Sequence, residues 1–156
     1  MMRSRYAFAA GLMALANASA YAGEGIGATR PTSQGAISMN INLTINGQVL
    51  SATLENNVAA QDFLGMLPLT LELEDYASTE KIAQLPRKLS TAGEPPGITP
   101  SVGDITYYAP WGNLAVFYKG FGHADGLVKL GHITSDIQVL RGRGPLRAHI
   151  EVAATR

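Results

Sequence analysis

The chain has 156 residues, with 12 basic and 12 acidic side chains and no cysteine. The balanced charge excludes the strongly positive surface that nucleic-acid binding requires, so no nucleic-acid partner is expected. Without cysteine no disulfide bond can form, and the fold must be held by the burial of apolar side chains.

The N-terminus has the pattern of a secretory signal peptide. Arg3 and Arg5 precede the apolar stretch YAFAAGLMALA, which small residues follow. A membrane-spanning helix needs about 20 apolar residues and this stretch is roughly half as long, so no membrane span is expected after cleavage. Small-x-small motifs predict cleavage after Ala22 or Ala20. Residues 1–22 are therefore predicted to direct a periplasmic or secreted protein.

Residues 23–37 are rich in small and polar residues and lack an apolar period, which predicts a disordered linker. Signal cleavage removes two arginines and no acid, so the mature chain would carry ten basic and twelve acidic residues. Residues 38–153 are predicted to form one domain with its own core.

The domain begins with a predicted β-hairpin. Apolar and polar residues alternate over 38–45 and again over 50–54, which is the period of a half-buried strand. Asn46-Gly47 lies between them and tolerates the positive φ angles of a type I′ turn.

A helix and a third strand follow the predicted hairpin. Asn56 or Asn57 is placed to cap a helix that ends at Pro68. One helical face carries four apolar residues: Ala60, Phe63, Leu64 and Leu67. Alternation over 69–74 predicts the strand, and a short helical turn is predicted from Ser78 to Gln84.

The second half of the domain contains a long loop and a second predicted hairpin. Residues 89–103 hold three prolines and three glycines, and such a loop either borders a site or is a plain surface excursion. Residues 103–120, GDITYYAPWGNLAVFYKG, contain five aromatic residues. Their alternation predicts two strands joined by a turn at 110–113.

The last predicted elements are a strand at Leu127–Ile133, a short helix and a strand at Leu146–Val152. Ser135 and Gln138 have the spacing of a capping box for the helix. In the final strand the predicted inward residues are Leu146, Ala148, Ile150 and Val152. About seven to eight short antiparallel strands with one main helix predict a mainly β fold, either a closed barrel or a sandwich with helical caps.

Two blocks in this order, ENNVAAQDFLGMLPLTLELEDY and GDITYYAPWGNLAVFYKG, resemble the small cyclophilin-like proteins of bacteria and archaea. The resemblance covers about residues 38–153. It implies a closed antiparallel β-barrel capped by one main and one or two short helices. The function of that family is largely unassigned.

The resemblance carries over no catalytic residue. Genuine cyclophilins isomerise X-Pro bonds with an arginine beside an apolar pocket and a glutamine on the backbone. The Phe-His-Arg and Phe-Met-x-Gln-Gly-Gly-Asp blocks that hold such residues are not found in this sequence.

Four residues are candidates for ligand binding: Trp111, Tyr107, Tyr118 and Arg87. Trp111 stands at a turn, so its indole either folds over the barrel mouth or stays exposed as a contact. Tyr107 and Tyr118 share a face with Leu114 and either complete the core or join the site. Arg87 would face a ligand only if it reaches the barrel mouth.

Other polar residues give weaker signals. Arg141, Arg143 and Arg147 suit an anion but equally suit a solvated loop. The histidines, His123, His132 and His149, lack the spacing of a metal site. No metal, cofactor or catalytic nucleophile is predicted, since phosphate loops and nucleophile elbows are missing from the sequence.

The sequence therefore predicts an exported, non-catalytic module that binds a peptide or a small molecule near Trp111. A divergent peptidyl-prolyl isomerase is the alternative. A structural protein that docks through a strand edge is a third possibility.

Overall fold

The computed structural model describes residues 39–155. The predicted signal peptide at 1–22 and the predicted linker at 23–37 lie outside the described residues. Within the described range, no helix is long and apolar enough to span a membrane.

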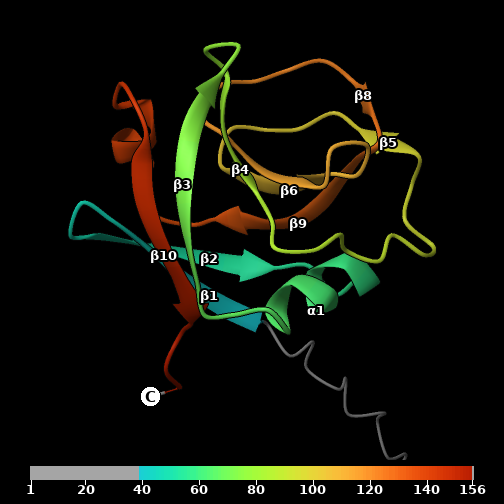
Figure 1. Ribbon diagram of the computed structural model, residues 1–156, viewed down its shortest axis with the longest axis horizontal. Helices are drawn as coiled ribbons and strands as arrows, with labels where there is room; N and C mark the ends of the chain where they lie inside the picture. Colours follow the sequence, from blue (N-terminus) through green and yellow to red (C-terminus); the bar gives the residue numbers. More distant parts are fainter. Residues whose placement is uncertain (1–38, 156) are drawn as a thin grey trace, which may run out of the picture. The chain divides into compact units, whose positions relative to one another are not determined.

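Eight antiparallel strands form a closed barrel in the order β1-β10-β3-β4-β7-β6-β9-β2 (Figure 1). Their bounds are β1 Met39–Ile45, β2 Gln48–Leu54, β3 Leu69–Tyr76, β4 Glu80–Gln84, β6 Asp104–Tyr108, β7 Asn113–Phe117, β9 Leu127–Ile133 and β10 Leu146–Val152. Two short strands, β5 Gly97–Ile98 and β8 Ala124–Asp125, pair with each other outside the barrel. The mainly β barrel is confirmed, and the sandwich is excluded.

The first hairpin forms as predicted. β1 and β2 pair from Met39 opposite Leu54 to Ile45 opposite Gln48. The two turn residues Asn46 and Gly47 have φ angles of 52° and 79°. Positive φ at both central positions is the requirement of a type I′ turn, which asparagine and glycine meet at little cost.

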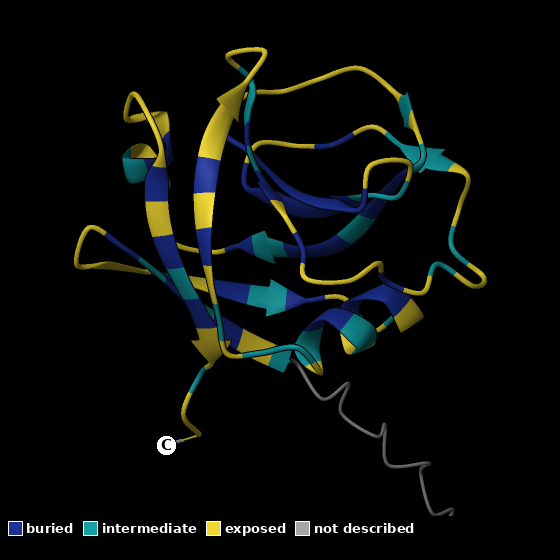
Figure 2. Ribbon diagram, viewed as in Figure 1, coloured by how far each residue is buried: buried dark blue, intermediate teal, exposed yellow. Residues whose placement is uncertain are grey.

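Apolar side chains from all eight strands fill the barrel interior (Figure 2). Fully buried examples are Ile41, Leu43, Ile45, Leu50, Leu73, Leu114, Leu130 and Ile150. Tyr107 and Tyr118 belong to the same cluster. The interior is therefore a packed core, and any ligand site must lie elsewhere on the barrel.

The helix α1, Val58–Leu64, covers the barrel core with Ala59, Ala60 and Phe63. Asn57 is the cap, since its Oδ1 accepts a hydrogen bond of 2.8 Å from the Ala60 amide. The helix ends at Leu64, three residues earlier than the limit that Pro68 would set. The amides of Met66 and Leu67 bond to carbonyls three residues back, so the chain tightens before it reaches the proline.

The predicted helical turn at Ser78–Gln84 is wrong, because these residues contain strand β4. β4 pairs with β3 on one side and with β7 on the other. Lys81 points inward and is completely buried, so a charged residue occupies a core position and hides the alternation. Its Nζ donates to the carbonyls of Gly142 and Gly144 at 2.7 and 3.1 Å.

Two details near the C-terminus also differ from the prediction. The helix after Ser135 is a short 3₁₀ turn, η1, Gln138–Arg141, and Asp136 rather than Ser135 accepts the hydrogen bond from the Gln138 amide. Ser135 instead accepts a hydrogen bond from the Ser51 amide. Val152 was predicted inward but is 56% exposed, because it is the last residue of β10 and lies at the end of the barrel wall.

Candidate functional site

A second apolar cluster lies on the outside of the barrel. Residues that alternate with the core positions of β6, β7 and β9 point outward and pack together. The buried members are Ala115, Phe117 and Leu127, with Ile82, Ile98, Tyr108 and Ala124 packed against them. Ile98 and Ala124 come from β5 and β8, so this small sheet covers part of the outer face.

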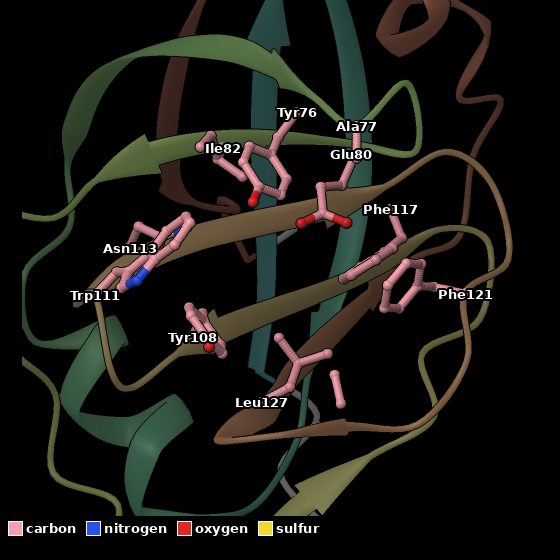
Figure 3. Close-up of a pocket in the computed structure, with 11 residues that line it drawn as sticks. Tyr76, Ala77, Glu80, Ile82, Tyr108, Trp111, Asn113, Phe117, Phe121 and Leu127 are labelled. Atoms are coloured by element: carbon pink, nitrogen blue, oxygen red, sulfur yellow. The ribbon is translucent and has the colours of Figure 1, made fainter.

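A pocket of about 190 Å³ opens beside this outer cluster. The residues that line it are Tyr76, Ala77, Glu80, Ile82, Tyr108, Trp111, Asn113, Phe117, Phe121, Ala124 and Leu127. Figure 3 shows Trp111 at one end of the pocket and Phe121 with Phe117 at the other. Five of the eleven lining residues are thus aromatic, and the walls come from β3, β4, β6, β7, β9 and the segment around β8.

Trp111 lies on the turn between β6 and β7 and packs against the outer side of the pocket. Its ring meets Tyr76 edge to face, with centroids 5.6 Å apart, and Tyr108 in the same way at 5.3 Å. The indole nevertheless stays 54% exposed. The sequence allowed the indole of Trp111 either to fold over the barrel mouth or to stay exposed as a contact. In the structure it stays exposed, and it borders a pocket on the outer face of the barrel.

The turn that carries Trp111 is held in place. The Gly112 amide donates to the Tyr108 carbonyl at 2.9 Å, and Gly112 has a φ of +75°, which favours glycine. From β4, the Gln84 amide nitrogen Nε2 donates to the carbonyls of Trp111 and Gly112 at 3.2 and 3.1 Å. The indole is therefore fixed relative to the neighbouring strand.

Glu80 supplies a carboxylate to this aromatic pocket. It lies on β4 between its register partners Tyr76 and Phe117, and Figure 3 shows its carboxylate between their rings. Burial raises the pKa of Glu80 above its ordinary value of 4.5. Among the described residues none forms an ion pair with it.

Asn113 brings a second acceptor to the pocket lining. The residue is only 5% exposed, and its Nδ2 donates to the Leu114 carbonyl at 3.3 Å. Its Oδ1 is buried without a hydrogen-bond partner among the described residues. Buried polar atoms are usually paired, so an orphaned acceptor beside a pocket is a feature that a ligand could satisfy.

A shallower depression of about 430 Å³ adjoins the pocket. It is lined by Glu72, Glu74, Ile82, Ala83, Gln84, Trp111 and Asn113. Trp111, Ile82 and Asn113 therefore belong to both hollows. The described lining residues of the two include three glutamates and no lysine, arginine or histidine.

Tyr107 and Tyr118, two of the four candidate ligand-binding residues, lie inside the barrel. Tyr107 is 1% exposed, and its hydroxyl accepts a hydrogen bond from the Leu89 amide. Tyr118 is 6% exposed, and its hydroxyl donates to Asp75 at 2.7 Å. Burial and this carboxylate raise the pKa of Tyr118 to about 12. The sequence allowed both tyrosines either to complete the core or to join the site, and in the structure both are part of the core.

Arg87 does not line either hollow. Its guanidinium forms a two-pronged ion pair with Asp62 of α1, at 2.6 and 3.0 Å. Asp62 also accepts a hydrogen bond from the Ser90 amide, and these partners lower the pKa of its carboxyl. The arginine therefore ties the loop after β4 to the helix.

The remaining candidates are dispersed. Arg141, Arg143 and Arg147 are all exposed and line neither hollow. The histidines contact separate partners: His123 with Asp125, His132 with Asp104 and His149 with Thr70. In the part of the chain that the structure describes, no group of three potential metal ligands comes together.

Of the eleven residues that line the pocket, only Trp111 was predicted as a ligand-binding residue, and Tyr76, Glu80 and Phe121 are among those that were missed. Tyr76 continues the polar face of β3, and its aromatic ring after two glutamates was the available signal. Glu80 fell within the wrongly predicted helical turn. Phe121 lies in the glycine-rich connection after β7, where no periodic pattern marks its neighbours.

The comparisons with known proteins agree with the barrel. Residues 43–151 match the cyclophilin-like family. No curated protein matches the chain. The solution structure of a hypothetical protein from Archaeoglobus fulgidus is similar, with a TM-score of 0.57 and 14% sequence identity over 78% of this chain and 99% of that protein. At this identity the likeness shows the fold alone. Since the family match covers more than two thirds of the sequence, the chain belongs to the cyclophilin-like family.

Proposed function

We propose that this protein is an exported binding module that holds a peptide or a small molecule in the Trp111 pocket and breaks no bond in it. The observation that carries the proposal is the exposed indole of Trp111 at the end of a concave, aromatic pocket. Ligand sites are typically apolar hollows with a few polar groups, and here Glu80 and Asn113 are those groups.

The size of the pocket limits what it holds. Drug-sized ligands fill about 300–1,000 Å³, whereas an engineered cavity of about 150 Å³ holds a single benzene ring. A pocket of about 190 Å³ therefore suits one ring or one large side chain. Any larger ligand would extend over Trp111 into the neighbouring depression.

Binding without catalysis is favoured over isomerisation by the chemistry of the lining. An X-Pro isomerase of the cyclophilin kind needs an arginine beside the proline pocket, and no arginine is among the described lining residues. Arg87, the candidate cation, is paired with Asp62 instead.

An exchange NMR experiment tests the proposal. A proline-containing peptide is added to the protein, and peptide shifts and cis/trans interconversion are measured together. Under the proposal, resonances of the pocket shift while interconversion stays at its uncatalysed rate. Accelerated interconversion would establish the isomerase alternative. If neither this peptide nor a panel of small aromatic compounds shifts pocket resonances, the binding function is wrong.

Export is a separate part of the proposal and rests on the N-terminal pattern of residues 1–22. N-terminal sequencing of periplasmic or secreted material should begin at Gly23 or Tyr21. Recovery of chains that retain Met1 in the membrane fraction would contradict it.

A further inference from the structure

We propose that the ligand of the Trp111 pocket is an organic cation, an ammonium group attached to a small apolar body. This inference rests on the proposed binding function and deepens it. Among the described residues, the Glu80 carboxylate has no ion-pair partner and Asn113 Oδ1 has no hydrogen-bond partner, and both groups at the pocket are hydrogen-bond acceptors. A ligand that satisfies them must bring N–H or O–H donors, and a carboxylate favours a positively charged donor.

The aromatic walls favour the same charge. Trp111 meets both Tyr76 and Tyr108 edge to face, so the indole stands at a steep angle to each of these rings at one end of the pocket. Aromatic faces attract cations, and arrangements of such rings beside a carboxylate recognise ammonium groups. In Figure 3 the Glu80 carboxylate lies between this aromatic end and the Phe117–Phe121 end. An ammonium group beside Glu80 would leave an apolar body in contact with either group of rings.

The lysine next to Glu80 in the sequence does not neutralise the pocket. Lys81 follows Glu80 directly, but its side chain enters the barrel and pairs there with Asp75. Across Trp111, Glu72 and Glu74 add two exposed carboxylates from the outward face of β3. The described residues that line the two hollows thus carry only negative charge, which favours a cation over an anion, and Arg147 of β10, opposite Glu72, offsets one of the three carboxylates.

The first test uses the only tryptophan of the chain as the reporter, since it borders the pocket. The fluorescence of the protein is titrated at neutral pH with three probes of similar shape: benzylamine, benzyl alcohol and benzoate. The expected result is that benzylamine binds about tenfold more tightly than benzyl alcohol, while benzoate binds weakest. Equal affinity for benzylamine and benzyl alcohol would overturn the cation proposal but leave the binding function intact. No response to any of the three would overturn both.

A pair of matched variants assigns the charge preference to Glu80. Glu80→Gln keeps the size of the side chain and should remove the preference for benzylamine while benzyl alcohol still binds. Glu151→Gln changes the net charge equally, lies on β10 and lines neither hollow, so it should leave the preference unchanged. An equal loss in both variants would show a general charge effect and overturn the assignment. Thermal melts of both variants check that they are folded.

A further experiment distinguishes two sources of the ammonium group, a basic peptide and a free small amine. The peptide acetyl-Phe-Lys-amide carries an ammonium group next to an aromatic ring on a peptide backbone, and benzylamine represents a free amine. Tighter binding of the peptide than of benzylamine, abolished by Glu80→Gln, identifies a basic peptide as the ligand class. Tighter binding of benzylamine identifies a small amine. If the analogue in which norleucine replaces the lysine binds as well as the peptide itself, the cation proposal fails for peptides.

Discussion

Lys81 reaches from β4 into the barrel and forms an ion pair with Asp75 of β3, with 2.9 Å between Nζ and Oδ2. The lysine is completely buried, while the aspartate side chain is 38% exposed. The pair stands at one end of the core, and the carbonyls of Gly142 and Gly144 take up the remaining hydrogen bonds of the ammonium group. A buried charge of this kind is tolerable because three acceptors, two carbonyls and a carboxylate, surround the ammonium group.

Lys81→Met should destabilise the domain by about 3 kcal/mol, since it keeps the stem but leaves two carbonyls without their donor and Asp75 with the Tyr118 hydroxyl alone. Urea unfolding followed by circular dichroism measures the change. The matched control is Lys88→Met, because Lys88 is exposed and should change stability by less than about 0.5 kcal/mol. Equal unfolding midpoints for the two variants would show that the buried network adds nothing.

Two alanine variants should distinguish a core residue from a site residue: Tyr118→Ala should mainly lower stability, and Trp111→Ala should mainly abolish ligand binding. The first removes a ring that is 6% exposed and should cost about 3–5 kcal/mol. The second removes a ring that is 54% exposed and should cost about 1 kcal/mol, from two lost edge-to-face contacts, while ligand binding is lost. Thermal melts decide between them. If Trp111→Ala unfolds the domain as strongly as Tyr118→Ala, the indole is part of the core.

Glu80→Gln should stabilise the unliganded protein at neutral pH by less than about 1 kcal/mol, because the carboxylate is only partly withdrawn from water. Burial raises the pKa of Glu80, so the folded state binds its proton more readily than the unfolded state does. The contribution of Glu80 to the stability of the natural protein therefore falls as the pH rises from below 4.5 through the raised pKa, and the gain from glutamine appears over the same range.

Melting curves of both proteins between acidic and neutral pH measure this difference. The ionisable groups around Glu80 are the phenols of Tyr76, Tyr108 and Tyr118, with Asp75 held by Lys81. These groups are present in both proteins, so the difference between the curves reports on Glu80. A difference that does not change with pH would contradict the assignment.

Arg87→Ala should lower the melting temperature at neutral pH and leave ligand binding unchanged, because the guanidinium pairs with Asp62 outside the pocket. Arg87 lowers the pKa of Asp62 below 3.8, so this stabilisation is present above that value and disappears as the pH falls through the lowered pKa. The two proteins should therefore melt alike in strong acid. Arg143→Ala, in an exposed loop, serves as the control. If Arg87→Ala loses benzylamine binding and Arg143→Ala keeps it, Arg87 is part of the binding site and the prediction is wrong.

Local patterns predicted the strands whose two faces differ in polarity. β1, β2 and β10 alternate almost without exception, and the turn residues Asn46 and Gly47 fixed the register of the first pair. β4 escaped prediction because Lys81 stands where an apolar residue is expected and Ile82 faces outward. The outward Ile82 is explained only by the second apolar cluster, which covers that face.

Of the residues that line the pocket, the sequence predicted Trp111 as a site residue and none of the others. Trp111 was conspicuous because a large ring at a turn cannot enter the interior. Tyr76 contacts Trp111, and Glu80 lines the same pocket, because β3, β4 and β7 are neighbours in the barrel, and strand order depends on contacts between distant segments. A single sequence contains no local signal for that order, so the carboxylate of the site became visible only in the folded barrel.

The last strand of the barrel, β10, lies between β1 and β3. Its seven residues, Leu146–Val152, satisfy backbone groups on the first strand of the described domain and on the β3–β4 hairpin at the same time. A chain cut short before Leu146 would leave both neighbours with bare edges, which invite pairing with other molecules. Pairing of this last strand with β1 and β3 therefore protects the barrel against aggregation, whatever the pocket binds.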